Sequence, residues 1–214
     1  MVAEKASRFK SCRTYKHLKC HRHSHADGNL AKYIMEFNFT QNYFELFGLE
    51  VDFQINEDTL AGNYQQLQSQ YHPDRFANSS DQDKRIAMQA TTFINEAYKT
   101  LREQQTRARY LLELTGIHFD IEKDTTHDMD FLVAQMSLRE EIDEVDKQND
   151  PLACLDKLVI QAKQEKTRLA EQFLEQYGAC NWQQAKNTVI KMQFFNRLQQ
   201  QINLKQEALE DELL

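Results

Sequence analysis

Apolar residues recur at helical spacing along most of the chain beyond residue 38. Two stripes with steps of about three and four residues, each typical of one face of an amphipathic helix, flank a polar loop at residues 78–81. The first consists of Leu60, Tyr64, Leu67 and Tyr71, and the second of Ile86, Ala90, Phe93, Ala97 and Leu101. Asn56 can cap the first helix, and the short loop forces the second to run back, so we predict an antiparallel helical hairpin.

Shorter helical segments flank this hairpin. The sequence YFELF, residues 43–47, ends at Gly48, which is a natural helix C-cap. Residues 106–114 carry Ala108, Leu111 and Leu112 before Gly116 stops the segment. We therefore expect residues 38–115 to form a small all-α domain.

The second half of the chain predicts a separate helical domain. Residues 116–127, GIHFDIEKDTTH, lack helical spacing and are predicted to be a linker. Periodic stretches at residues 128–148, 152–177 and 182–209 follow, separated by Pro151 and Gly178. Because short connections make neighbouring helices antiparallel, we predict a three-helix bundle over residues 128–214. The all-α fold class also fits the scarcity of turn residues, with five glycines and two prolines in 214 residues.

Charge divides the chain into a basic start and an acidic remainder. Residues 1–34 hold eight Lys or Arg and two acidic residues, whereas the rest holds 18 basic and 31 acidic residues. An acidic body repels phosphate backbones, so we expect no nucleic-acid partner. Residues 1–37 lack hydrophobic periodicity and are predicted to be a disordered basic tail.

Three alternatives for the tail stay open. Met35 could be the true start, which would make the tail an extension of the reading frame, or the tail could be a targeting peptide. Its Cys12, His17, Cys20 and His21 could also bind a metal ion, although their spacing matches no familiar zinc site.

The remaining composition bounds the location and the cofactors. No apolar run approaches the roughly 18 residues of a membrane-spanning helix. The four cysteines are scattered and contain no CxxC pair, which argues against a disulfide framework, a zinc ribbon or a cysteine-ligated iron–sulfur site. We expect a cytoplasmic protein, or a mitochondrial-matrix protein in a eukaryote, without membrane contact, metal or other cofactor.

A proline corner interrupts the helical pattern at QYHPDRF, residues 70–76. Pro73 lacks an amide hydrogen and forces His72 out of the helix, so the imidazole projects from a rigid turn. Asp74 can accept hydrogen bonds from local amides or from a partner's arginine. A plain helix end is one alternative. A hydrolase using His72 and Asp74 is another, but no Gly-rich phosphate loop, nucleophile elbow or HExxH motif accompanies them.

A His-Pro-Asp corner between two amphipathic helices resembles the J-domain, by which co-chaperones of DnaK-type chaperones switch on their partner's ATPase. The motifs NYFELFGL, LQSQYHPDRFA, INEAYKTLRE and RARYLLELTGI, followed by FLVAQMSLREEIDEV, are similar to the HscB family of iron–sulfur cluster assembly. The resemblance covers essentially residues 42–214.

The resemblance implies a co-chaperone that is not itself an enzyme. The J-domain would engage an ATP-bound HscA-type chaperone through His72, Pro73, Asp74 and Arg75, while the C-terminal bundle holds the scaffold protein IscU. Bringing the scaffold and the ATPase stimulus together would couple cluster transfer to ATP hydrolysis, with the chain acting as a monomer. A J-domain co-chaperone for a different client is the alternative.

One feature departs from the family. Family members usually carry Lys or Arg on the helix before the corner, but residues 56–70 contain none and hold several glutamines instead. Attraction to an acidic chaperone surface should therefore be weaker and less dependent on salt.

A second candidate site lies on the first bundle helix. A helical wheel places Phe131, Ala134, Leu138, Ile142 and Val145 on the core side. The opposite side carries Leu132, Val133 and Met136 beside Glu140 and Glu144. Periodicity alone leaves open whether this apolar patch binds a partner or packs against the J-domain. The resemblance assigns these residues to scaffold binding, together with Phe194 on the last helix.

Overall fold

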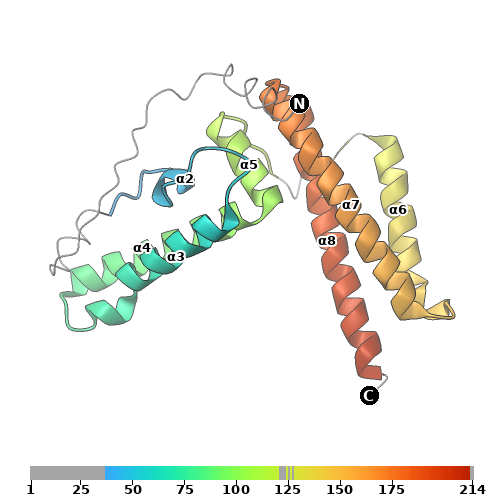
Figure 1. The fold of residues 1–214 in the computed structure, drawn as a ribbon, viewed down its shortest axis with the longest axis horizontal. Helices are drawn as coiled ribbons and strands as arrows, with labels where there is room; N and C mark the ends of the chain where they lie inside the picture. The colour runs from blue at the N-terminus through green and yellow to red at the C-terminus, as the bar shows by residue number, and fades with distance from the viewer. Residues whose placement is uncertain (1–36, 121–123, 125, 127, 213–214) are drawn as a thin grey trace. The chain divides into compact units, whose positions relative to one another are not determined.

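The computed structural model describes residues 37–120, 124, 126 and 128–212, and these residues contain helices and no strand. The predicted all-α fold class is therefore confirmed (Figure 1). The elements are α2 (Tyr43–Leu46), α3 (Glu57–Tyr71), the 3₁₀ turn η2 (Pro73–Phe76), α4 (Asp81–Arg102), α5 (Gln104–Leu114), α6 (Met129–Asp143), the 3₁₀ turn η3 (Val145–Lys147), α7 (Pro151–Gly178) and α8 (Trp182–Glu212).

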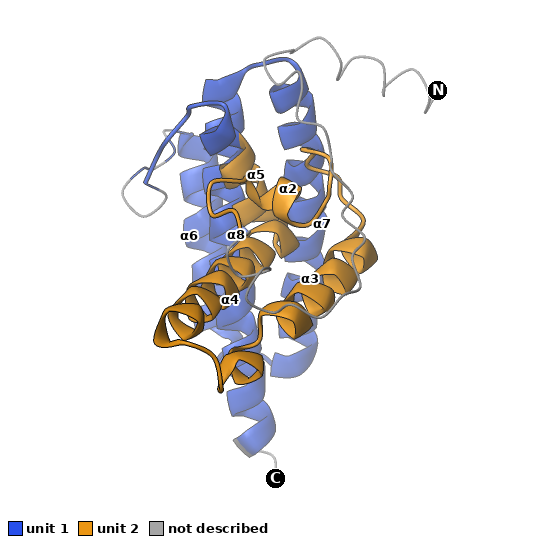
Figure 2. Ribbon diagram, turned by 90° about the vertical axis from the view of Figure 1, so that its left-hand side faces the viewer, with its two compact units in different colours: residues 1–12, 112–214 blue, residues 13–111 orange. Residues whose placement is uncertain are grey.

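The described residues form two compact units, one up to residue 111 and the other from residue 112 onwards (Figure 2). The first unit contains the α3–α4 hairpin. Asn56 begins α3 as predicted, because its side-chain oxygen accepts the Thr59 amide at 2.8 Å. Ser80 caps α4 in the same way through the Asp83 amide at 3.2 Å. Capping residues in the polar segments thus set where each helix of the hairpin starts.

The buried stripe of α4 differs from the predicted one. Ala90, Ala97 and Leu101 are fully buried as expected, but Ala87 and Ile94 are buried where Ile86 and Phe93 were predicted. The buried stripe runs along the side of α4 that carries the alanines. The larger neighbours lie at its edge, where the Phe93 ring centroid is 5.5 Å from that of Tyr43 and 5.9 Å from that of Phe37.

Glycine at a positive φ ends the short helix α2. Gly48 has φ +61°, and its amide donates to the Glu45 carbonyl at 3.0 Å. The Leu49 amide donates to the Phe44 carbonyl at 2.8 Å, which completes a Schellman motif. Most residues resist this backbone conformation, so the predicted C-cap role of Gly48 is confirmed.

The second unit consists of α6, α7 and α8, with a core mostly supplied by α7 and α8. That core includes Leu155, Leu158, Ala162, Leu169 and Phe173 of α7 and Ala185, Val189, Met192, Leu198 and Ile202 of α8. From the first helix it receives Leu138 and Ile142, with Val145 following in η3. Ala134 is exposed, so its predicted core position was wrong. It lies at the edge of the apolar arc and carries only a methyl group.

The turn between α7 and α8 begins later than expected. Gly178, predicted to break the helix, is its last residue, and Cys180 adopts the left-handed conformation at φ 58°. The Asn181 amide then donates to the Gln176 carbonyl at 2.9 Å and closes a Schellman motif around this non-glycine residue.

The described part of the segment predicted as a linker packs within the second unit. Phe119 is 8% exposed, and the Lys186 Nζ lies 5.3 Å from the centre of its ring. The same ammonium group pairs with Asp124 at 3.0 Å, and Thr126 is also buried. These contacts fasten residues that precede α6 to the start of α8. Of the predicted tail, residues 1–37, all but Phe37 lie outside the described residues, and the Phe37 ring packs against those of Tyr71 and Phe93.

Candidate functional site

The His-Pro-Asp corner follows directly from the end of α3. The helix ends at Tyr71, and His72 adopts φ −59° and ψ 129°, the extended backbone that a following proline favours. Pro73 then starts η2, where a residue without an amide hydrogen is tolerated. The His72 side chain is 52% exposed and that of Asp74 is 92% exposed. The corner therefore presents an imidazole and a carboxylate to solvent.

The imidazole is oriented by the backbone of the corner. The Asp74 amide donates to Nδ1 of His72 at 3.3 Å. The Asp74 carboxylate lies 3.6 Å from the same nitrogen, which is too far for a hydrogen bond. Because Nδ1 acts as an acceptor, the neutral ring carries its hydrogen on Nε2. The backbone amide of Asp74 is thus a donor to His72, and acceptance by its carboxylate from a partner's arginine stays a prediction.

Buried residues anchor the corner on both sides. Tyr71, immediately before it, is 7% exposed. Phe76, at the end of η2, is 1% exposed and packs against Ala87 and Ile86 of α4. With a buried aromatic side chain at each end, the exposed residues between them have little room to move.

Positive charge near the corner is sparse, as the sequence indicates. The last turn of α3 holds no basic residue, and Gln65 and Gln66 are exposed on that helix. Arg75 directs its guanidinium back onto the chain, where Nη1 donates to the Ser69 carbonyl at 3.0 Å. Lys84 lies 3.8 Å from Asp81. The geometry therefore offers a largely neutral face before the corner.

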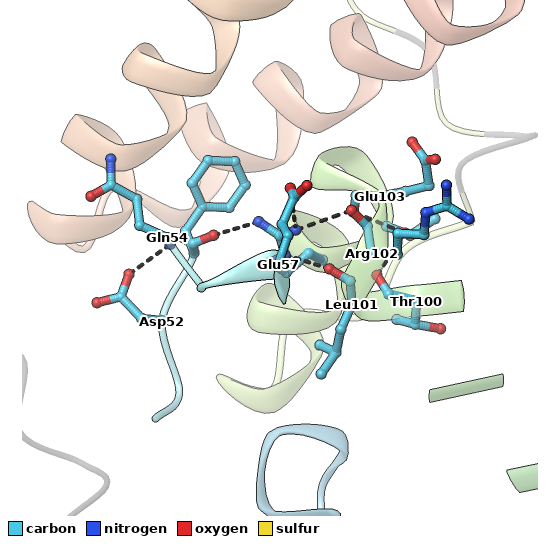
Figure 3. A network of polar contacts seen from close by, with 10 residues as sticks. Asp52, Gln54, Glu57, Thr100, Leu101, Arg102 and Glu103 are labelled. Carbon is cyan, nitrogen blue, oxygen red and sulfur yellow. Dashed lines mark hydrogen bonds and ion pairs between the residues drawn. The ribbon is translucent and has the colours of Figure 1, made fainter. Parts of the chain in front are cut away.

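Arg107 of α5 joins three segments of the first unit (Figure 3). Its Nε donates to the Leu101 carbonyl at 2.6 Å and its Nη2 to the Arg102 carbonyl at 3.0 Å, which caps the end of α4. Its Nη1 donates to the Phe53 carbonyl, in the loop before α3, at 2.8 Å. Burial lowers the pKa of Arg107 from its ordinary value, an effect that Glu57 opposes from 3.6 Å.

The role of Arg107 was not predicted from the sequence, although the residue begins the motif RARYLLELTGI. A cation beside Ala108 and ahead of Leu111 on an otherwise apolar helix face is a signal of a buried, paired arginine. Its acceptors could not be read from the sequence, because Phe53 is 54 residues away.

The predicted patch on α6 is exposed at its centre. Val133 is 60% exposed and Met136 is 63% exposed, while Leu132 is half-buried. Glu140 and Glu144 are exposed on the same helix and at its C-cap, and Glu144 pairs with Lys147 at 2.9 Å. We call these five residues the α6 patch. They form an apolar centre with an acidic border.

Phe194 of α8, predicted to bind the scaffold with the α6 patch, is only 7% exposed. Its ring meets that of Phe131 edge-on with centroids 5.7 Å apart, and the Arg139 guanidinium carbon lies 5.6 Å from its centre. Phe194 thus holds α6 against α8, which makes it a support for the patch. Direct contact with a scaffold stays a prediction.

The described part of the chain contains neither a cluster of metal-binding side chains nor a membrane-spanning helix. No group of three or more His, Cys, Asp or Glu side chains there is placed to hold a metal ion. No helix within the same residues has the length and apolar content needed to cross a membrane.

Comparison with protein families matches both halves of the chain. The DnaJ domain model matches residues 42–110, which include the corner and the Arg107 network. The model of the HSCB C-terminal oligomerisation domain matches residues 127–203, which include the α6 patch.

Full-length relatives agree with the family models. The chain is 39% identical over 173 residues to a co-chaperone protein HscB homolog of Pseudoalteromonas atlantica, covering 79% of this chain and 99% of that protein. Among solved structures it is similar to chaperone HscB from Vibrio cholerae, with 35% identity, a TM-score of 0.71 and coverage of 81% and 100% of the two chains. The human co-chaperone protein HscB gives 28% identity, a TM-score of 0.72 and coverage of 78% and 83%. The chain belongs to the HscB family of J-domain co-chaperones.

Proposed function

We propose that this co-chaperone stimulates the ATPase of an HscA/DnaK-type chaperone through its His-Pro-Asp corner and presents an IscU-type scaffold through the α6 patch. The carrying observation is the corner itself, where exposed His72 and Asp74 are fixed between buried Tyr71 and Phe76. A rigid, exposed polar group can bind a partner without losing much conformational entropy.

The chaperone contact would depend more on short-range, directional hydrogen bonds than on long-range attraction between charges. The Asp74 carboxylate, 92% exposed, suits a bidentate contact with a partner's arginine. The adjoining helix holds no basic residue, so the positive charges available to an acidic chaperone face are those of Arg75, Lys84 and Arg85. Few charges mean weak steering, and we expect the association rate to change little with salt.

The scaffold contact would centre on apolar burial. Val133 and Met136 offer the exposed apolar area, and Glu140 and Glu144 lie beside them. Such a surface fits a partner with a hydrophobic centre and basic residues at its edge. Holding the scaffold on one unit while the other stimulates ATP hydrolysis would couple iron–sulfur cluster transfer to the chaperone cycle.

The proposal also covers the chain's own chemistry and location. We propose that it works as a monomer in the cytoplasm, or in the mitochondrial matrix of a eukaryote, and that the hydrolysis it promotes occurs on the chaperone. His72 Nδ1 accepts the Asp74 amide, and at 3.6 Å the Asp74 carboxylate is too far from it for the hydrogen bond that a catalytic dyad would require.

A different client is the remaining candidate, and a direct binding experiment separates the two. Immobilised full-length chain should retain purified IscU and should not retain an unrelated substrate of a DnaK-type chaperone. Retention of the unrelated substrate without IscU would support the different client and overturn the proposed scaffold.

A further inference from the structure

Pro73 leaves two carbonyl groups at the end of α3 without the amide donors of a continuing helix. In a continuing helix, the amide of residue 73 would donate to the carbonyl of Ser69, and the amide of residue 75 to that of Tyr71. Proline has no amide hydrogen, and the Arg75 amide donates to His72 instead, at 3.0 Å. The carbonyls of Ser69 and Tyr71 are therefore left without their helical donors.

The Arg75 side chain replaces the donor that the proline removes. Its Nη1 bonds to the Ser69 carbonyl at 3.0 Å, four residues before Pro73. A cation at a helix C-terminus also interacts favourably with the exposed carbonyl ends. The guanidinium thus reaches back across the corner and ties its far side to the last turn of α3.

Thr91 of α4 supplies the second donor. Its hydroxyl bonds to the Tyr71 carbonyl at 2.9 Å, from 20 residues away in the sequence. Tyr71 is the residue immediately before His72, so this bond fixes the backbone from which the imidazole departs. Thr91 is partly buried on the side of α4 that faces the end of α3.

We propose that Thr91 and Arg75 are positioning residues of the corner, which hold His72 and Asp74 in the orientation that the partner chaperone binds. Neither needs to touch the reacting ATP. The inference rests on the proposed ATPase stimulation, and it concerns how the corner is kept ready for docking.

Thr91→Val and Thr91→Ser form the matched pair, because valine keeps the shape and removes the hydroxyl whereas serine keeps the hydroxyl. If only a fraction of molecules holds the docking orientation, the concentration of co-chaperone needed for half-maximal stimulation rises in inverse proportion to that fraction. We expect Thr91→Val to raise it about fivefold, the worth of one ordinary hydrogen bond, with the plateau unchanged. Thr91→Ser should stay near the wild-type value. Equal behaviour of wild type and Thr91→Val, or equal loss in both variants, overturns the inference.

For Arg75, the control is Arg85→Met, which removes the same charge a few residues away, where Arg85 contacts the Asp81 carbonyl at 3.4 Å. Raised salt screens charge effects but leaves positioning effects in place. We expect the loss of ATPase stimulation in Arg85→Met to fade at high salt and the loss of ATPase stimulation in Arg75→Met to persist. Parallel fading in both variants overturns the positioning role of Arg75.

Amide hydrogen exchange tests the inference independently of the chaperone. The Arg75 amide, bonded to the His72 carbonyl, should exchange about fivefold faster in Thr91→Val than in wild type or Thr91→Ser. An unchanged exchange rate contradicts the inference even if stimulation is seen. Failure of the wild-type chain to stimulate any HscA-type chaperone would instead reject the proposed function.

Discussion

The backbone amide of Asp74 donates a hydrogen bond to Nδ1 of the His72 imidazole at 3.3 Å. This bond fixes the imidazole against the turn without using the Asp74 carboxylate, which stays 92% exposed. The two polar groups of the corner are therefore held relative to each other through the backbone while both face outwards. A partner can engage them separately.

Replacing the imidazole tests that arrangement. We expect His72→Gln to leave the helical content and thermal midpoint nearly unchanged, because the side chain is 52% exposed. The ATPase of an HscA-type chaperone should then stay at its basal rate. Asn78→Ala, in the exposed loop after the corner, is the control and should stimulate normally. Full stimulation by His72→Gln would show that the corner is not the stimulating group.

Arg107 should be essential for the stability of the first unit. Arg107→Met leaves the carbonyls of Phe53, Leu101 and Arg102 without their donor in a buried setting. We expect a loss of about 3–5 kcal/mol in unfolding free energy, typical of breaking a buried charged network. Urea unfolding followed by circular dichroism measures it.

The matched control is Arg102→Met, whose side chain is exposed. It should change the unfolding free energy by less than about 0.5 kcal/mol. Similar small losses in both variants would mean that the Arg107 network contributes no more than a surface contact.

Asp128 should make the second unit sensitive to acid. Lys191 donates to its carboxylate at 2.5 Å and, with the Phe131 amide, lowers the pKa of Asp128. A carboxyl group with a lowered folded pKa stabilises the fold above the ordinary aspartate range near pH 4. That contribution is lost as the pH falls from there through the lowered pKa.

Asp128→Asn separates the charge from the helix cap, since asparagine can still accept the Phe131 amide. We expect the thermal midpoint of this variant to fall less steeply than that of wild type below about pH 4. Asp130→Asn, at the neighbouring exposed position, is the control and should keep the wild-type slope. Identical slopes in wild type and Asp128→Asn would contradict the assigned ion pair.

The α6 patch can be tested by removing apolar area. Combined Leu132→Ala, Val133→Ala and Met136→Ala should weaken IscU binding by at least about tenfold, because burying one such side chain is worth about 1.5–3 kcal/mol. Calorimetry measures the affinity, and circular dichroism checks that the bundle stays folded. Ile160→Ala on α7, a residue 57% exposed, is the matched truncation and should bind as wild type. Undiminished binding by the triple variant would reject the patch.

Local chemistry in the sequence was enough to predict the helices and the corner. Asn56 and Gly48 act within their own turns, through a cap and a positive φ, so short-range rules identify them. The α4 stripe was harder, because the pattern accepts either Phe93 or Ile94 as a core residue. Only the packing of α4 against the rest of the unit decides between them.

The long-range contacts of Thr91 and Arg107 could not be predicted, because they join residues far apart in the sequence. Thr91 bonds to a carbonyl 20 residues away and Arg107 to one 54 residues away. Likewise, a helical wheel cannot show that Phe194 is covered by Phe131 and Arg139. Patterning locates the faces of a helix, whereas these bonds depend on which helices meet.

The most direct test of the account is the steady-state ATPase rate of an HscA-type chaperone, measured with this chain and IscU added separately and together. We predict that each alone stimulates weakly and that both together exceed the sum of their separate effects, because one molecule then delivers the scaffold and the stimulus. The triple variant of the α6 patch should keep its own stimulation and lose the synergy. Purely additive rates with wild-type chain would contradict the coupling of scaffold delivery to ATP hydrolysis.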